Sequence, residues 1–531
     1  MLYREIENMR RRLAGEQGTI IKGWGGKIPV ALVYPSSYYI GMSSLGVHAI
    51  YKLLNGYDNI VCERAFWEKG SSVTAPVVSI ESIRPLSDFA VIAMSITYEL
   101  DYFNIPLILK SCGIPVYAAD RNESYPLVIA GGPVVMANPA PIAPFFDAVC
   151  IGEAEPLIPA IVPVFSEIGN ISRDELLKKL ADIPSIYVPK FYSGTPIVRQ
   201  YAENLDAFPV STAVVTRDTD FGDMYMIEVE RGCNWRCRFC LVGNTFSPMR
   251  YRSLDTILEQ AGRGLKFCKR IGLVGPDVSD YPHLEELITR LWEMGAEISI
   301  SSLRVKPFFP VVLQKLVESG AKTITIAPEA GSDRMRRIIA KGITQDDIFG
   351  AITAIAKEKV KELKLYFMIG LPEETDEDVA AIASLVLDCK HILDVKSSGT
   401  RLNITVSPFI PKAGTPWERL PMADLNVIKA RLSFLKSKLP EKGVSLHSES
   451  PTWSEVQAAL ARGDSSFAPV IVAAGEVSLP SWQRALRECQ VDVGAFAHRK
   501  WADDEKLPWN MIDLGPERGT CLPKKILKLN I

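Results

Sequence analysis

The chain has 531 residues, of which 47% are hydrophobic and 23% charged, as in an ordinary soluble globular protein of roughly two to four domains. Its net charge of −2 excludes a strong general attraction to nucleic acid or anionic lipid. No apolar run approaches the ~20 residues of a membrane span, and the charged first segment lacks the apolar core of a signal peptide. We therefore expect a cytoplasmic protein without a membrane or nucleic-acid partner.

The first part of the chain alternates short apolar strands with helices. After a helical segment over 1–26, strands are predicted over 27–35, 89–94, 127–130 and 148–151, and helices over 44–54, 100–111 and 154–165. This alternation predicts a doubly wound, Rossmann-like parallel sheet over 27–200, an α/β fold that binds ligands beyond the carboxyl ends of its strands. Polar residues and glycines follow those strands, and they would let a large flat ligand approach the backbone: Ser95, Thr97, Tyr98, Gly131, Gly132, Pro133, Gly152 and Glu153.

A linker over 201–222 leads to a second series of helix–strand units. Strands are predicted over 224–229, 270–274, 297–301, 323–327, 363–369 and 402–407, which indicates a partial β/α barrel over 223–440. Functional groups of such barrels lie where strands end. Polar or small residues follow these strands: Gly275, Asp277, Ser302, Arg304 and Glu329. The alternative for Glu329 and Arg304 is a solvated position or a mutual ion pair.

The last part, 441–531, is predicted to be a small, mostly helical domain. It is nearly neutral and lacks the basic, strand-rich character of an RNA-binding module. Its tryptophans are expected to pack in a core.

Three cysteines after the strand at 224–229 form the pattern C-x3-C-x2-C: Cys233, Cys237 and Cys240. Three soft thiolates on a short tether favour an iron–sulfur cluster or zinc. No fourth Cys or His follows at the spacing of a closed zinc site, which favours a cluster with one iron left open for chemistry. A zinc knuckle or incidental cysteines is the alternative. Arginines crowd this loop and are expected to keep the thiols ionised: Arg231, Arg236 and Arg238.

With Phe239 as the aromatic residue before the last cysteine, this pattern resembles the signature of the radical S-adenosylmethionine (SAM) enzymes. The resemblance implies a [4Fe–4S] cluster whose open iron is chelated by SAM, and cleavage of SAM to a 5′-deoxyadenosyl radical. It further implies that Gly275 and Asp277 lie near the amino acid part of SAM, that Glu329 binds the ribose hydroxyls and that Lys341 pairs with the SAM carboxylate. Ser302 and Arg304 are candidates at the same face, and Phe239 would contribute only its backbone.

The first domain resembles the cobalamin-binding domain that precedes the barrel in the B12-dependent subfamily, through the stretches GGP at 131–133 and GEAE at 152–155. The sequence departs from that pattern in the first strand–helix loop, 35–42, which lacks the cobalt-ligating histidine; Tyr38, Tyr39 or Met42 could face the corrin instead. His48 is interpreted as a helix residue. The alternative is a flavodoxin-like domain that holds no corrin.

These resemblances imply a cobalamin-dependent radical SAM C-methyltransferase, fed by an external flavodoxin- or ferredoxin-type electron donor and acting on a small molecule, a protein or a peptide. A methylthiotransferase or other sulfur-inserting, tRNA-modifying enzyme is one alternative, and it would need a second cluster. A non-catalytic corrinoid or SAM carrier is another. The other seven cysteines have no framework spacing and are expected to be reduced thiols: Cys62, Cys112, Cys150, Cys268, Cys389, Cys489 and Cys521.

Overall fold

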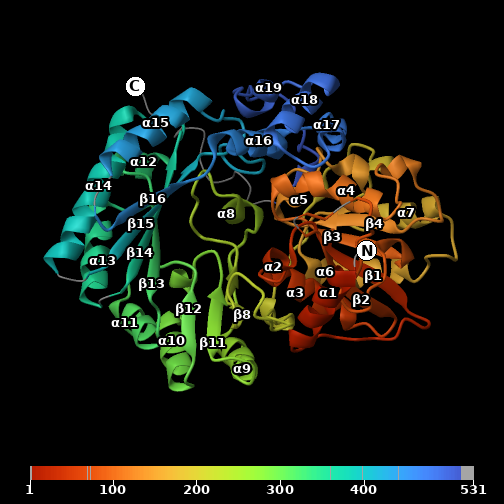
Figure 1. The fold of residues 1–531 in the computed structure, drawn as a ribbon, viewed down its shortest axis with the longest axis horizontal. Coiled ribbons are helices and arrows are strands. Elements are labelled where there is room, and N and C mark those ends of the chain that lie inside the picture. The colour runs from red at the N-terminus through yellow and green to blue at the C-terminus, as the bar shows by residue number, and fades with distance from the viewer. Residues whose placement is uncertain are drawn as a thin grey trace.

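The computed structural model of the protein describes residues 3–68, 70–71, 73–358, 360–396, 399–439 and 442–515. Cys521 lies outside these ranges. Figure 1 shows a first α/β domain beside a curved β/α barrel, with a group of helices lying over both. The fold class expected from the sequence is confirmed. Within the described ranges, no helix has both the length and the apolarity needed to span a bilayer.

The first domain is built on a sheet in the order β2-β1-β3-β4-β5-β6, parallel except for the last strand. Side chains of β1 alternate between two apolar cores, so helices cover both faces. The strands are β1 (Ile28–Tyr34), β2 (Ile60–Phe66), β3 (Val91–Ser95), β4 (Leu127–Gly131), β5 (Ala148–Cys150) and β6 (Ile186–Tyr187). One face packs α3 (Leu45–Asn55), α6 (Ala154–Phe165) and α7 (Arg173–Ala181), and the other packs α4 (Asn104–Ser111) and α5 (Pro133–Ala137).

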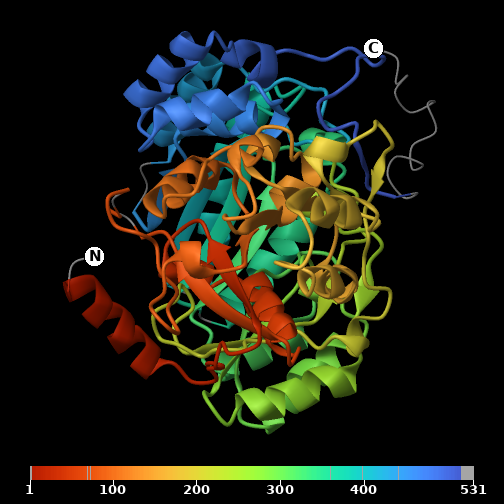
Figure 2. The ribbon, with the colours of Figure 1, turned by 90° about the vertical axis from the view of Figure 1, so that its right-hand side faces the viewer.

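The chain that precedes the sheet is held by a buried ion cluster. Helix α1 (Tyr3–Gly15) lies along the outside of the domain (Figure 2). Arg64 of β2 is 1% exposed and pairs with Glu16 at 2.6 Å and with Glu81 at 2.7 Å. Tyr38, in the short helix α2 (Tyr38–Gly41), donates its hydroxyl to Glu16. A buried charge is tolerated only when it is paired, so this cluster fixes the N-terminal segment onto β2.

The barrel strands run parallel in two adjacent sheets, β12-β11-β8 and β13-β14-β15-β16. Their carboxyl ends all meet at one face. The strands are β8 (Met224–Glu228), β11 (Arg270–Val274), β12 (Glu297–Ile300), β13 (Thr323–Glu329), β14 (Glu362–Ile369), β15 (Arg401–Pro408) and β16 (Val444–Ser448). The outer helices are α9 (Leu254–Gly264), α10 (Leu284–Glu293), α11 (Pro310–Glu318), α12 (Asp333–Ile338), α13 (Gln345–Lys357), α14 (Asp376–Val395) and α15 (Leu425–Lys438).

The barrel is not closed at β8, because the predicted linker occupies the edge of that strand. Thr212 donates its backbone N–H to Met226, and Glu228 donates its own to Val210. The first domain stands against this side, where α5 contacts α8 (Leu241–Thr245) of the cysteine loop (Figures 1 and 2). Strand β16 continues the barrel sheet beyond residue 440, where the sequence pattern placed the end of the barrel.

Four helices of the last part lie over the junction between the barrel and the first domain (Figure 1): α16 (Pro451–Arg462), α17 (Phe467–Ala474), α18 (Leu479–Cys489) and α19 (Val493–Ala497). Trp482, Trp501 and Trp509 are buried among them and their neighbours, as the composition predicts. The chain then returns to the first domain, where β17 (Ile512–Asp513) pairs with β7 (Ile197–Val198). The last part thus ties the two larger parts together.

Candidate functional site

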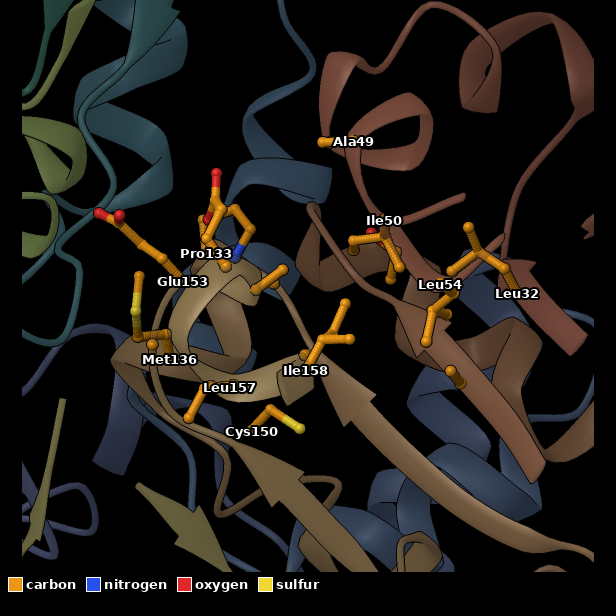
Figure 3. Close-up of a pocket in the computed structure, with 18 of the residues that line it drawn as sticks. Leu32, Ala49, Ile50, Leu54, Pro133, Met136, Cys150, Glu153, Leu157 and Ile158 are labelled. Atoms are coloured by element: carbon orange, nitrogen blue, oxygen red, sulfur yellow. The ribbon is translucent and has the colours of Figure 1, made fainter. Parts of the chain in front are cut away.

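An apolar cavity of about 320 Å³ opens at the carboxyl edge of the first sheet, between α3 and α6. Figure 3 shows Ile50 and Leu54 of α3 across the cavity from Leu157 and Ile158 of α6. Small residues of α3, Gly46 and Ala49, leave this space open. Its far rim belongs to the barrel and its approach: Val210, Glu228, Arg231, Phe246 and Val274. A molecule bound in the cavity would therefore lie beside the loop that carries the three cysteines.

Most residues predicted for a large ligand line this cavity: Ser95, Thr97, Gly131, Gly132, Pro133, Gly152 and Glu153. Tyr98 lies in a different cavity, beside α16, and the hydroxyl of Tyr39 donates to Asp220 on an exposed surface. Tyr38 and Met42 are buried in the domain, and neither lines the cavity. His48 is a buried helix residue bonded to Met42 O at 3.0 Å. Within the described residues, no histidine lines the cavity.

Two glycines at the cavity allow the protein's own backbone segments to pack closely, and they do not open a path for a ligand. A Cβ on Gly132, which has φ +124°, would lie 2.1 Å from Ile96 O, and one on Gly152, with φ +150°, would lie 2.4 Å from Gln200 O. Both positions therefore require glycine with or without a ligand.

Glu153 connects the first domain to the barrel. It accepts from Arg250 at 2.7 Å and from Arg231 at 2.7 Å, and it is 4% exposed. Glu155 pairs with Arg231 at 2.7 Å. Burial alone would raise the pKa of Glu153, but the hydrogen bond from Arg250 and the charge of Arg231 outweigh burial and lower it. The arginines lie on the antiparallel pair β9 (Glu230–Arg231) and β10 (Arg250–Tyr251). We call Glu153, Glu155, Arg231 and Arg250 the interdomain clamp.

The three cysteines lie on the loop between β9 and α8, with Cys240 as the N-cap of α8. Gly243 donates its backbone N–H to Cys240 Sγ at 3.5 Å. Cys237 is buried and its sulfur lies 3.9 Å from Ala340 O, while Arg238 donates its backbone N–H to Ile339 O. Within the described residues, no group of three or more His, Cys, Asp or Glu side chains is close enough to hold a single metal ion. The thiols thus do not form a closed zinc site.

The loop arginines do not ionise these thiols, so that expectation was wrong. Burial raises the pKa of Cys233 to about 12 and that of Cys237 to about 11. The cations that oppose this rise come from other loops of the barrel: Arg304 at Cys233, and Lys341 with Arg304 at Cys237. Arg231 is already engaged by three carboxylates. The thiols therefore need a metal to displace their protons.

A corner of buried carboxyls lies beside Cys233. Asp277 donates its backbone N–H to Glu230 Oε1 at 2.6 Å, and its carboxylate pairs with Arg304, whose guanidinium lies 3.8 Å from the ring centroid of Trp235. Burial raises the pKa of Glu230 to about 8 and that of Asp277 to about 7. Glu230 Oε2 and Arg304 Nη1 are buried without a hydrogen-bond partner in the described chain, while Asp277 Oδ2 is held in the ion pair with Arg304. The sequence pattern did not single out Glu230 or Trp235, although both flank the cysteines.

Glu329 and Lys341 form a second polar pair at the same face, with Nζ 3.2 Å from Oε1. Glu329 has φ +68°, a left-handed conformation that costs a non-glycine residue about 1–3 kcal/mol and is typical of functional sites. Glu329 and Arg304 do not pair with each other, because Glu329 pairs with Lys341 and Arg304 pairs with Asp277. Phe239 packs against an apolar cluster that includes Leu371, and Ser302 lines a gap between β12 and β13.

Comparison with known proteins identifies the family. Residues 46–189 match the model of the N-terminal region of radical SAM proteins, and residues 227–386 match that of the radical SAM superfamily. The uncharacterized protein MJ0966 of Methanocaldococcus jannaschii is 32% identical over 442 residues, 82% of this chain and 89% of that protein. The chain belongs to the radical SAM superfamily. Residues Cys233, Cys237 and Cys240 thus carry the signature of a radical SAM enzyme.

More distant similarities cover part of the chain. The threonylcarbamoyladenosine tRNA methylthiotransferase MtaB of Aquifex aeolicus is 22% identical over 61% of this chain and 72% of its own length. The solved structure of the cobalamin-dependent SAM radical enzyme OxsB, with aqua-cobalamin and SAM bound, matches with a TM-score of 0.51. That match has 14% identity and covers 87% of this chain and 70% of OxsB, so it shows a shared fold.

The barrel of this radical SAM enzyme is suited to its family's cofactors, a [4Fe–4S] cluster and SAM. The three cysteines of the family signature, on one loop, suit a cluster that leaves one iron open. The unpartnered acceptor Glu230 Oε2 suits the ammonium group of an amino acid, and the unpartnered Arg304 Nη1 suits a carboxylate. The Glu329–Lys341 pair offers one acceptor and one cation for the remaining polar groups.

Changing Glu329 to Gln is expected to weaken SAM binding about tenfold, because charge-assisted hydrogen bonds are lost while the shape is kept. Equilibrium dialysis of labelled SAM against cluster-loaded protein would measure this. Glu318→Gln, an exposed change on α11 with a similar loss of charge, is the matched control and should bind as the unchanged protein does. Loss of iron in place of SAM affinity would contradict the assignment.

Proposed function

We propose that this radical SAM enzyme is a cobalamin-dependent methyltransferase that acts on an unactivated carbon and has no second cluster in its first domain. When bound, the cluster and SAM supply a radical that removes hydrogen from carbon, and cobalamin supplies the methyl group. The chain's own residues would bind and orient these groups and keep water from the junction between the two domains.

The observation that carries this proposal is the position of the cavity in the first domain. It is apolar, it opens at the carboxyl edge of a parallel sheet, and its rim includes Arg231 and Phe246 of the cysteine loop. A cavity of about 320 Å³ is too small for a whole corrin but suits an appended heterocyclic base. The OxsB structure, which has cobalamin and SAM bound, supports the proposal through its similar fold.

Anaerobic reconstitution with iron, sulfide and hydroxocobalamin tests the proposal. After gel filtration we expect about one corrinoid and one [4Fe–4S] cluster per chain. Under a low-potential reductant, the protein should form both 5′-deoxyadenosine and S-adenosylhomocysteine from SAM. Absence of corrinoid absorbance together with absence of S-adenosylhomocysteine would sink the methyltransferase proposal. Absence of 5′-deoxyadenosine would instead indicate a carrier.

Filling the cavity should remove the corrinoid and leave the cluster. Ala49→Phe places a phenyl ring between α3 and α6, in the space that the ligand would occupy. Because overpacking costs at least about 1 kcal/mol, we expect cobalamin to bind at least about tenfold more weakly. Spectrophotometric titration would measure it. Lys52→Phe adds the same ring to the exposed side of α3 and is the matched control. Equal affinity in the two variants would show that the corrinoid binds elsewhere.

A methylthiotransferase is the second candidate, because MtaB and other methylthiotransferases are among the relatives. That function would need a second cluster in the first domain. Cys62 lies on β2, Cys112 follows α4 and Cys150 lies on β5. Within the described residues these thiols do not gather into a metal-binding group. About eight irons per chain, in place of about four, would favour this candidate.

A further inference from the structure

A second cavity, of about 470 Å³, lies where the three parts of the chain meet. Tyr98 and Leu100 come from the loop after β3, Glu449 and Ser450 follow β16, and the remaining lining residues belong to α16 and its neighbour: Trp453, Ser454, Gln457 and Val477. Figure 1 shows α16 above the junction of barrel and first domain. Both β3 and β16 contribute their carboxyl ends, the edges at which the two domains present their functional groups. We call this space the junction cavity.

Its polar side chains include several hydrogen-bond acceptors, of Glu449, Gln457 and Ser454. Gln457 is 9% exposed, and its Nε2 donates to Glu99 Oε2 at 2.8 Å, which turns the amide oxygen away from that carboxylate. Ser454 is 4% exposed. Neither Gln457 Oε1 nor Ser454 Oγ has a hydrogen-bond partner in the part of the chain that the structure describes. Neither is among the fully buried atoms that lack a partner, so both still reach solvent at the cavity, and a ligand there would bond them in place of water.

The charge around the cavity has one sign. Burial raises the pKa of Tyr98 to about 12, and the charges of Glu449, Glu99 and Asp101 add to the rise. Among the described residues that line the cavity there is no lysine, arginine or histidine. Lys412, which reaches Glu99 behind the cavity, is paired with that carboxylate. A group with several N–H donors and a positive charge would satisfy the free acceptors, and the rings of Tyr98 and Trp453 would favour it through their faces.

We infer that the junction cavity binds a cationic group of the substrate, a guanidinium or an ammonium. Glu449 supplies the countercharge, Gln457 Oε1 and Ser454 Oγ accept its N–H groups, and Tyr98 with Trp453 form the walls. That the cavity is a subsite for the substrate rests on the proposed function. Such a subsite would hold one end of the substrate while the carbon to be modified reaches the junction of the two domains.

The test is direct binding to the purified full chain, without reductant, by ligand-observed NMR or calorimetry. The probes are agmatine, the capped peptide acetyl-Gly-Arg-Gly-amide, and the same peptide with neutral citrulline in place of arginine. We expect the guanidinium probes to bind with Kd near or below about 1 mM, and the citrulline peptide to bind at least about tenfold more weakly. Tighter binding of agmatine indicates a small-molecule substrate, and tighter binding of the arginine peptide indicates a peptide.

Two variants assign the binding to this cavity. Glu449→Gln removes the countercharge and should weaken the guanidinium probes about tenfold, and Ser454→Ala should weaken them less. Glu285→Gln, on an exposed position of α10, is the matched control and should bind as the unchanged protein does. Equal binding of the arginine and citrulline peptides, unchanged binding by Glu449→Gln, or no binding of either guanidinium probe would overturn the inference. Because no radical chemistry is involved, a negative result leaves the proposed function untouched, and failure of corrinoid binding does not alter this measurement.

Discussion

Replacing Cys237 with alanine is expected to remove the iron–sulfur cluster and with it all formation of 5′-deoxyadenosine. Cys237 is the most buried of the three cluster cysteines, and its thiol lies against the 339–341 segment that also carries Lys341. With two thiolates left, the cluster would lose one of the three ligands that the motif supplies. The iron content and the absorbance at about 400 nm of anaerobically reconstituted protein would measure the loss.

Cys268→Ala is the matched control, because Cys268 lies on the barrel between α9 and β11, away from the cysteine loop, and its thiol donates to Arg270 O. This variant should keep the iron of the unchanged protein and cleave SAM at an unchanged rate. If Cys237→Ala retained a full cluster, the radical SAM chemistry would have to depend on a different ligand set.

In the first sheet, the sequence pattern predicted the strands whose residues are apolar throughout, and it missed β2, which carries charge. Strands β1, β3, β4 and β5 were all predicted, because each is a short apolar run between turn signals. Strand β2 was not, since Glu63 and Arg64 interrupt its run. Both charges are buried there because partners far along the chain reach them: Glu16 and Glu81 for Arg64, and Trp24 for Glu63. Pairing over such separations leaves no periodic signal.

The same limit applies to the site. The three cysteines form a local motif, so the sequence alone predicted them. The partners of Asp277 and Arg304 lie on other strands, and only the fold brings Glu230 and Trp235 to them. Glu153 was predicted to face a cofactor because it follows a strand of the first sheet. It does line the cavity, but its carboxylate is bound by two arginines of the barrel, which a pattern within the first domain cannot reveal.

The second large effect is expected from Glu153→Ala, which should destabilise the contact between the first domain and the barrel by about 3–5 kcal/mol. The change leaves the buried guanidinium of Arg250, 8% exposed, without its carboxylate partner and deprives Arg231 of one of its three. An uncompensated buried charge costs far more than the loss of a surface pair. Because a chain with several domains does not unfold in one step, the first urea transition and the rate of proteolysis between the domains are the quantities to measure.

Two further variants separate charge from packing. Glu153→Gln keeps the shape and part of the hydrogen bonding, so its cost should lie between those of the unchanged protein and Glu153→Ala. Glu286→Ala breaks an exposed pair with Arg290 on α10 and should cost no more than about 0.5 kcal/mol. If Glu153→Ala lowered the stability no more than Glu286→Ala does, the interdomain clamp would not stabilise the contact between the first domain and the barrel. A large effect would mean that this one carboxylate fixes the position of the cysteine loop relative to the cavity. A molecule bound in the first domain would then lie at a distance from the cluster that Glu153 sets.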